Sequence, residues 1–125
     1  MELNQYQELA ARTINKELTW KQQGRHALYG MASEVGEIQG IYQKKYQGHP
    51  FDESEVKKEV GDLMWFIAEY CTAHGWTLEE IAQANIDKLI ARYPEGFDAE
   101  RSVNRGKYEQ SGEKKKNPQN IGQNT

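Results

Sequence analysis

Helical periodicity is the feature of this sequence that most limits what the chain can fold into. Apolar residues recur three and four positions apart in four successive segments, and no run of alternating apolar and polar residues competes with them as a strand. The pattern therefore predicts an all-α fold.

Turn and capping residues indicate where the first two helices begin and end. The first is expected to begin near Asn4, a suitable N-cap, and to end before the stretch "TWKQQG". The second is expected over residues 26–46, because Gly48 and Pro50 of "QGHP" favour a turn directly after it.

The third and fourth helices have similar signals. The third is expected to start after Asp52 or Ser54, and Gly75 suits the left-handed position that follows a helix. The fourth opens with "TLEE" at 77–80, where a threonine and a glutamate three positions later can form a capping box. It is expected to end before the proline of "RYPEGF".

The length of 125 residues predicts one domain, which we place at residues 1–105. Residues 106–125 are almost entirely polar, and we expect them to form a disordered C-terminal tail. Hydrophobic residues make up 37% of the chain and the mean hydropathy is -0.95, so the core of a single copy would be thin. Self-assembly is therefore expected.

Charge and cysteine content exclude several classes of partner. A net charge of -3 gives no general attraction to nucleic acid polymers or to anionic membranes. Cys71 is the only cysteine, and no stretch resembles a membrane span or a secretory signal. The expected location is the cytoplasm.

Four acidic residues border the apolar faces of the second and third helices. Glu34 falls inside the apolar face of the second helix, and Glu37 lies at the rim of that face one turn later. Glu59 and Asp62 have the same spacing along one edge of the third helix. An antiparallel pairing of the two helices would bring all four carboxylates into one patch.

The third helix is expected to pack through an apolar stripe beside these acids. The stripe consists of Val56, Val60, Leu63, Ile67, Tyr70 and Cys71. Each acidic pair also encloses a glycine, Gly36 or Gly61, and these glycines would permit close approach of a neighbour.

Clustered carboxylates need to be neutralised. Two like charges about 4 Å apart repel by about 4 kcal/mol at an effective dielectric constant near 20. The acids could share protons, pair with Lys44, Lys45 or Lys88, or hold a divalent cation. Because neither acidic motif contains Cys or His, the ligand set suits Mg²⁺, or Mn²⁺, rather than Zn²⁺.

The fourth helix carries polar residues that suit a phosphate ligand. Asn85 falls within its expected apolar face, with Lys88 and Arg92 on one side. An amide and two cations on one helix edge can bind phosphate oxygens and a metal ion.

Aromatic residues offer contacts to a planar ligand or to a second copy of the chain. Trp20, in the expected loop before the second helix, could stack on a base, as could Phe66 or Tyr46. Trp65 points almost opposite the apolar stripe of its helix, so we expect it to be exposed and to lie in a subunit interface.

The acidic motifs and the fourth helix together resemble a known family. "EVGE" at 34–37, "EVGD" at 59–62 and "ANIDKLIARYPEGF" at 84–97 resemble the MazG-like all-α nucleoside triphosphate pyrophosphohydrolases. The resemblance covers roughly residues 4–105.

The resemblance implies a four-helix-bundle-like domain that assembles into a dimer or tetramer and acts as an Mg²⁺-dependent enzyme. The implied reaction hydrolyses a (deoxy)nucleoside triphosphate between the α and β phosphates, giving the monophosphate and pyrophosphate. Carried over by position, the catalytic metal ligands are Glu34, Glu37, Glu59 and Asp62. The implied metal or phosphate contacts are Asn85 and Lys88, to which helical position adds Arg92. Of the acids, Glu37 is the expected acceptor of the proton from water.

Two alternatives stay open at the level of sequence. One is hydrolysis of phosphoribosyl-ATP, which is catalysed by relatives with similar acids. The other is a helical module that binds nucleotide or metal and dimerises without catalysis. The intact set of four acids favours an enzyme.

Overall fold

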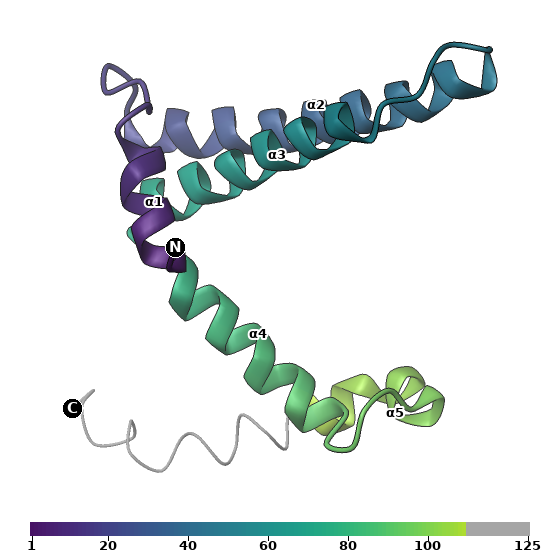
Figure 1. The fold of residues 1–125 in the computed structure, drawn as a ribbon. Helices are drawn as coiled ribbons and strands as arrows, with labels where there is room; N and C mark the ends of the chain where they lie inside the picture. Colours follow the sequence, from purple (N-terminus) through teal and green to yellow (C-terminus); the bar gives the residue numbers. More distant parts are fainter. Residues whose placement is uncertain (110–125) are drawn as a thin grey trace. The chain divides into compact units, whose positions relative to one another are not determined.

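A computed structural model describes residues 1–109, and all named elements in that range are helices (Figure 1). In chain order they are α1 (Leu3–Ala11), α2 (Trp20–Tyr46), α3 (Glu53–Ala73), α4 (Leu78–Arg92) and α5 (Ala99–Val103). The all-α fold class is confirmed. Among the described residues, no helix is both long enough and apolar enough to cross a membrane.

The chain divides into two compact units. The first is Met1–Glu79, with α1, α2, α3 and the first two residues of α4, and the second begins at Glu80. Residues 105–109 are helical, so the tail expected from residue 106 opens on a helical turn, while residues 110–125 lie outside the described range. A single domain over residues 1–105 stays a prediction.

The central pair of the first unit is α2 and α3, which run side by side in opposite directions (Figure 1). Helix α2 begins at Trp20, six residues before the predicted start. The reason is a capping box: the Thr19 side chain accepts from the Gln22 N–H at 3.2 Å, and the Gln22 side chain accepts from the Thr19 N–H at 2.9 Å.

Helix α3 begins and ends at the expected places. The Asp52 side chain accepts from the Ser54 N–H at 2.9 Å and caps the first turn. At the other end, Gly75 has φ +72°, and the Trp76 N–H donates to the Cys71 carbonyl at 2.9 Å. The left-handed glycine allows the chain to turn back, so that this hydrogen bond satisfies a carbonyl in the last turn of the helix.

Helix α1 starts differently from the prediction. Its N-cap is Glu2, whose side chain makes no capping bond, and Asn4 lies inside the helix. Asn4 instead bonds Glu79 at the start of α4, so its side chain is unavailable to cap its own helix.

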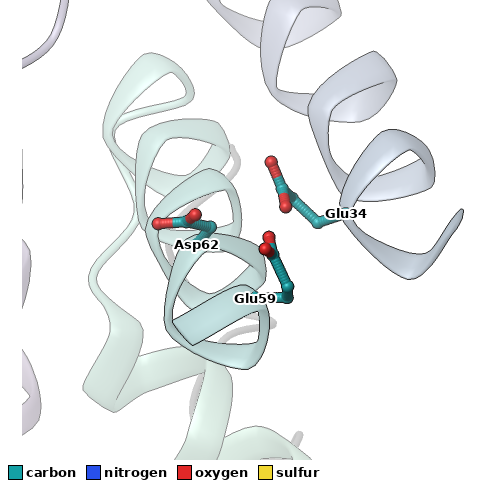
Figure 2. A group of neighbouring side chains, drawn as sticks. All are labelled: Glu34, Glu59 and Asp62. Carbon is teal, nitrogen blue, oxygen red and sulfur yellow. The ribbon is translucent and has the colours of Figure 1, made fainter. Parts of the chain in front are cut away.

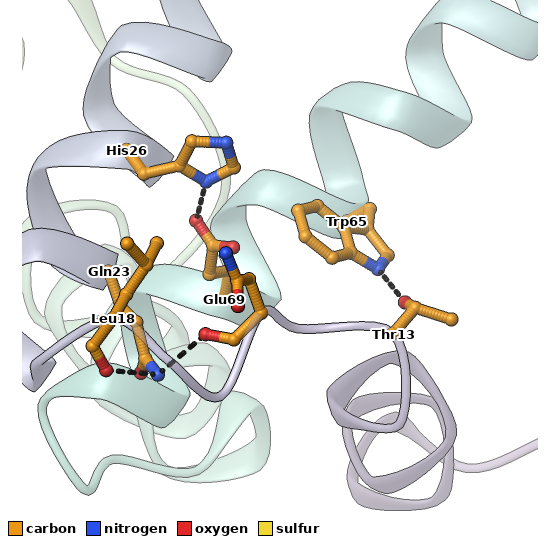
Figure 3. Close-up of polar contacts among 7 residues, drawn as sticks. Thr13, Leu18, Gln23, His26, Trp65 and Glu69 are labelled. Atoms are coloured by element: carbon orange, nitrogen blue, oxygen red, sulfur yellow. Dashed lines mark hydrogen bonds and ion pairs between the residues drawn. The ribbon is translucent and has the colours of Figure 1, made fainter.

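The buried core of the first unit is small. One cluster consists of Ala10, Ala68, Cys71 and Leu78, flanked by the partly buried Tyr6 and Trp65, and Ile14 and Ala27 are also buried. The prediction that Trp65 is exposed is wrong, because its indole N–H donates to the Thr13 hydroxyl at 2.8 Å and its ring packs on this cluster (Figure 3).

Only part of the predicted apolar stripe of α3 is covered: Tyr70 lies beside Gly24 of α2, and Cys71 is buried in the core. Val60 and Ile67 of that stripe are exposed, while Phe66 and Glu69, which lie on a different side of α3, face residues of α2. The interface therefore uses the side of α3 that carries the acids and aromatic rings. The stripe formed by Val60, Met64 and Ile67 stays open to solvent in the described chain.

Gly30 of α2 lies directly against Phe66 of α3. A methyl group added there would collide with the ring of Phe66. The predicted role of Gly36 and Gly61 in close approach is wrong for the described chain, since an added Cβ at either position meets nothing within 4 Å. The position of α2 that requires glycine against α3 therefore lies one turn before Glu34.

A polar pair also joins α2 to α3. Nδ1 of His26 lies 2.6 Å from Oε1 of Glu69, a residue that is only 1% exposed (Figure 3). Gln23, one turn before His26, donates to the carbonyl of Leu18 at 3.3 Å and so fastens the connection that leads into α2.

The second unit contains one helix that the sequence did not predict. Helix α5 is capped by Asp98, whose side chain accepts from the Arg101 N–H at 3.0 Å. Arg101 also donates to the carbonyls of Ala91 and Arg92, the last residues of α4. These bonds satisfy two of the carbonyl groups that have no partner within the last turn of α4.

Candidate active site

Acidic side chains from α2 and α3 converge in the first unit (Figure 2). Glu34 of α2 points toward Glu59 and Asp62 of α3, and one carboxylate oxygen from each residue lies within 4.8 Å of the other two. Glu59 and Asp62 lie one turn apart and therefore on the same side of α3. That side faces α2 near Glu34, so the three carboxylates converge. The sequence predicted this part of the cluster.

Burial is uneven within the cluster. Glu34 and Glu59 are partly buried, while Asp62 is exposed. Burial raises the pKa of Glu34, a hydrogen bond with Glu59 raises it further, and the charges of Asp62, Glu59 and Glu37 act in the same direction. Glu34 therefore holds a proton more readily than an ordinary glutamate.

The cluster has a vacant acceptor. Oε2 of Glu34 is buried and has no hydrogen-bond partner. A buried carboxylate oxygen without a partner is costly, so the folded chain gains if a cation or a proton reaches this atom.

Within the first unit, Met1–Glu79, no ion pair joins a basic side chain to these three acids. Lys58, whose charge is close to Glu59, pairs instead with Glu55 at 2.8 Å. Lys45, one of the lysines considered from the sequence, lies over the ring of Phe51, 4.6 Å from its centre. Proton sharing and cation binding both fit this cluster, and pairing with Lys44 or Lys88 stays a prediction.

The donor set fits a hard divalent cation. Three carboxylates supply only oxygen, as Mg²⁺ and Mn²⁺ prefer, and the unpartnered Glu34 oxygen adds an acceptor that has no other use. Glu34, Glu59 and Asp62 are the residues that would hold such an ion.

Glu37, the fourth predicted acid, stands apart from this group. It is exposed on α2, one turn after Glu34, and it is not among the residues whose oxygens converge. Its charge still contributes to the raised pKa of Glu34. Glu37 is therefore close enough to act electrostatically while remaining in contact with solvent.

The three predicted phosphate contacts lie on α4, within the second unit. Asn85 and Lys88 are exposed, so Asn85 does not sit in a packed apolar face as predicted. Arg92 is mostly covered and forms an ion pair with Glu109. Asn85 and Lys88 are thus accessible to a ligand, whereas Arg92 already has an acidic partner.

The prediction that Trp20 lies in a loop is wrong. It is the first residue of α2, and 54% of the residue is exposed. It borders a groove of about 190 Å³ together with Lys21, Arg25, Tyr70 and His74, among others. Trp20 precedes Glu34 by fourteen positions on one helix, which corresponds to about 21 Å along the axis. It is therefore remote from the acids of its own chain.

Aromatic rings lie closer to the acids than Trp20 does. Phe66 follows Asp62 by one turn of α3, and its ring centre is 5.1 Å from that of Trp65 and 5.6 Å from that of His26. The sequence had suggested Phe66 as a stacking residue but gave no role to His26.

Comparison with known proteins identifies the family of this chain. A family model, the MazG nucleotide pyrophosphohydrolase domain, matches residues 22–97, more than half of the chain. No curated protein and no solved structure gives a significant match. The matched range contains all three converging acids and the predicted contacts on α4, and it supports nucleotide pyrophosphohydrolase activity in general. The chain therefore belongs to the MazG nucleotide pyrophosphohydrolase family.

Proposed function

We propose that this protein hydrolyses (deoxy)nucleoside triphosphates between the α and β phosphates in an Mg²⁺-dependent reaction, with Mn²⁺ as a possible substitute. The observation that carries the proposal is the convergence of Glu34, Glu59 and Asp62, with one Glu34 oxygen buried and unpartnered. A cation at this site would satisfy that oxygen, and a cation held by carboxylates is suited to grip a polyphosphate.

The reaction adds one water across one phosphoanhydride bond. The water oxygen bonds to phosphorus, the bond between the bridging oxygen and that phosphorus breaks, and the products are the monophosphate and pyrophosphate. Bound Mg²⁺ supplies charge neutralisation on the triphosphate and acidifies water. Glu34, Glu59 and Asp62 would hold the ion in place.

We assign the proton acceptor to Glu37. Its carboxylate is exposed and lies outside the converging group, so it is free to take the proton that the attacking water loses. That proton then passes to solvent or to the departing pyrophosphate, which balances the reaction.

Substrate contacts are proposed on α4 and among the aromatic residues. Asn85 and Lys88 are exposed and can bind phosphate oxygens, while Arg92 would first have to leave Glu109. Phe66 is proposed to contact the base, because it lies one turn from Asp62. Trp20, about 21 Å from Glu34 along α2, would reach a nucleotide at these acids from a second copy of the chain.

A homodimer or homotetramer in the cytoplasm completes the proposal. Val60, Met64 and Ile67 follow a spacing of four and three residues, so they form one apolar stripe on α3, and all three are exposed. Helix α2 adds the exposed Leu28 and Val35. Light scattering after gel filtration would test the assembly, and a monomer at micromolar concentration would contradict it.

The test of the function is a substrate panel with the full chain. Each (deoxy)nucleoside triphosphate and phosphoribosyl-ATP is incubated with Mg²⁺ or Mn²⁺, and pyrophosphate release is followed. Turnover of a nucleoside triphosphate supports the proposal, and preferential turnover of phosphoribosyl-ATP would reassign the substrate. Nucleotide binding by calorimetry without any pyrophosphate would show a non-catalytic module instead.

A further inference from the structure

We infer that the pair formed by Glu69 and His26 fixes the register of α3 against α2 and so positions the three acids for the ion. Both are positioning residues, since neither belongs to the group of converging carboxylates. The inference rests on the proposed function, in which Glu34, Glu59 and Asp62 hold a divalent cation. Every residue involved lies within the first unit.

Three pairs of residues succeed one another along the contact between α2 and α3. The α3 members are three or four positions apart and the α2 members are four apart, so each helix uses one side. The pairs are Asp62 with Glu34, Phe66 with Gly30, and Glu69 with His26. The ion site and the polar pair are thus the two ends of one row of contacts.

The two ends of this row are almost equally spaced on the two helices. Glu69 follows Asp62 by seven residues, or about 10 Å along the axis of α3. His26 precedes Glu34 by eight residues, or about 12 Å along α2. Because the two helices run in opposite directions, contact between Glu69 and His26 brings Asp62 to the level of Glu34 (Figure 1).

Apolar packing alone does little to fix this register. The buried residues of α2 are Gly24, Ala27 and Gly30, whose side chains are too small to interlock with those of α3. The ring of Phe66 covers Gly30, but a ring can slide along a row of small residues. A slip of one turn would move Glu34 by about 5.4 Å, which exceeds the 4.8 Å that encloses the three carboxylate oxygens.

The polar pair supplies the directional contact that the small residues lack. Oε1 of Glu69 lies 2.6 Å from Nδ1 of His26, and Glu69 is only 1% exposed (Figure 3). Two rings of α3 flank the imidazole, since its centre is 5.6 Å from that of Phe66 and 6.5 Å from that of Trp65. A slipped register would leave the Glu69 carboxylate buried without a partner, which destabilises every arrangement except the native one.

Substitutions can remove the polar pair without leaving a buried charge. The paired replacement, His26→Ala with Glu69→Met, deletes both polar groups, so it should be more stable than His26→Ala alone. Glu69→Gln and His26→Asn each keep a polar group that can bond the remaining partner. Ile14→Val is the control, because it trims a buried side chain outside α2 and α3 and lowers stability without touching the pair.

The experiment measures Mn²⁺ affinity, urea unfolding and the Mg²⁺ dependence of turnover for the full-length wild type and each variant. The paired replacement is expected to weaken Mn²⁺ binding about ten-fold, the lower end of the loss that follows when support for metal ligands is removed. The Mg²⁺ concentration for half-maximal turnover should rise in proportion, while kcat at saturating Mg²⁺ changes less. Glu69→Gln and His26→Asn should each bind Mn²⁺ within about two-fold of wild type, because the hydrogen bond persists.

A general loss of stability would give a different pattern, in which Mn²⁺ affinity follows the free energy of unfolding in every variant. Equal losses of affinity in Ile14→Val and the paired replacement would therefore overturn the inference, as would equal losses in Glu69→Gln and the paired replacement. Should the paired replacement fail to fold, the contrast between His26→Ala and His26→Asn tests the same prediction. A wild type that binds no Mn²⁺ would overturn the proposed ion site and this role together, whereas wild-type affinity in the paired replacement overturns this role alone.

Discussion

Nδ1 of His26 lies 2.6 Å from Oε1 of Glu69 and links an exposed ring on α2 to a fully buried carboxylate on α3. The two partners are unequal, since the histidine side chain is 52% exposed and can be solvated after its partner is removed. Glu69 cannot reach water without movement of the helices. Removal of the histidine should therefore lower the free energy of unfolding by more than the contact itself contributes.

His26→Ala is expected to lower the free energy of unfolding by about 1–3 kcal/mol, because it strands a buried carboxylate. Glu69→Gln should cost less, since its amide oxygen can still accept from Nδ1 of His26. Urea unfolding of each variant measures both values. The double change His26→Ala with Glu69→Met is the control, and it should recover part of the loss because no buried charge is left.

Glu34→Gln is expected to reduce turnover at least about 100-fold, because it removes a carboxylate from the proposed ion site. The far-ultraviolet circular dichroism should stay nearly unchanged, and without metal the variant should be at least as stable as wild type, since one source of repulsion is gone. Calorimetry with Mn²⁺ should show a weaker site. Turnover above a tenth of the wild-type rate would place the active site elsewhere.

Glu37→Gln should behave differently from Glu34→Gln. We expect Mn²⁺ affinity close to wild type, since Glu37 is outside the converging group, but a fall in kcat of about 100-fold for loss of a general base. Parallel calorimetry and pyrophosphate assays on the two variants measure this contrast. If Mn²⁺ binding weakens equally in both, then Glu37 is a ligand and not the proton acceptor.

The raised pKa of Glu34 predicts a pH dependence in the metal-free protein. Between its ordinary pKa and its raised value, the folded chain keeps a proton that the unfolded chain has lost. The free energy of unfolding should therefore fall as pH rises through this interval and level off above it. Melting temperatures of wild type and Glu34→Gln, compared at each pH, isolate this contribution.

The same proton competes with the cation. Mg²⁺ affinity should rise with pH over that interval, because the ion must displace the proton from Glu34. At saturating Mg²⁺ the fall in wild-type stability should disappear. A difference between wild type and Glu34→Gln that does not vary with pH would contradict the assignment.

Two glycines of α2 should respond oppositely to alanine. Gly30→Ala places a methyl group against the Phe66 ring and should cost about 1–3 kcal/mol of unfolding free energy. Gly36→Ala meets nothing within 4 Å in the described chain and should stabilise the helix by up to about 1 kcal/mol. Urea unfolding of both variants under metal-free conditions is the test, and a loss at position 36 equal to that at position 30 would contradict it.

Local signals in the sequence predicted part of the fold. Asp52 and Gly75 gave the correct ends of α3, because capping and left-handed turns depend on a few neighbouring residues. The start of α2 was missed, although Thr19 and Gln22 have the spacing of a capping box. The capping signal was therefore present, but Gly24, in the second turn of α2, disfavoured an earlier start of the helix.

Choices that depend on a partner element were harder to predict. Asn4 reads as an N-cap by its type, yet its amide binds Glu79, which is 75 residues away. The side of α3 that meets α2 carries Phe66 and Glu69 rather than the most apolar stripe. Periodicity ranks the faces of a helix by hydropathy, but it does not say which neighbour will cover each face.

The candidate site was predicted better than the packing around it. Glu34, Glu59 and Asp62 converge because two helices with regular spacing run antiparallel, and both conditions can be inferred from sequence. Glu37 was placed with them by spacing alone, yet it stays exposed outside the group. Spacing along one helix does not show how far its contact with the neighbouring helix extends. A residue one turn beyond Glu34 can therefore already face solvent.

The unpartnered oxygen of Glu34 has a consequence for the lifetime of the chain. An ion that binds this atom recognises the folded form alone, so by mass action each increment of free divalent ion reduces the fraction of unfolded molecules. Proteases act on that fraction. The ionic composition of its surroundings would then set how long each molecule survives as well as how fast it works.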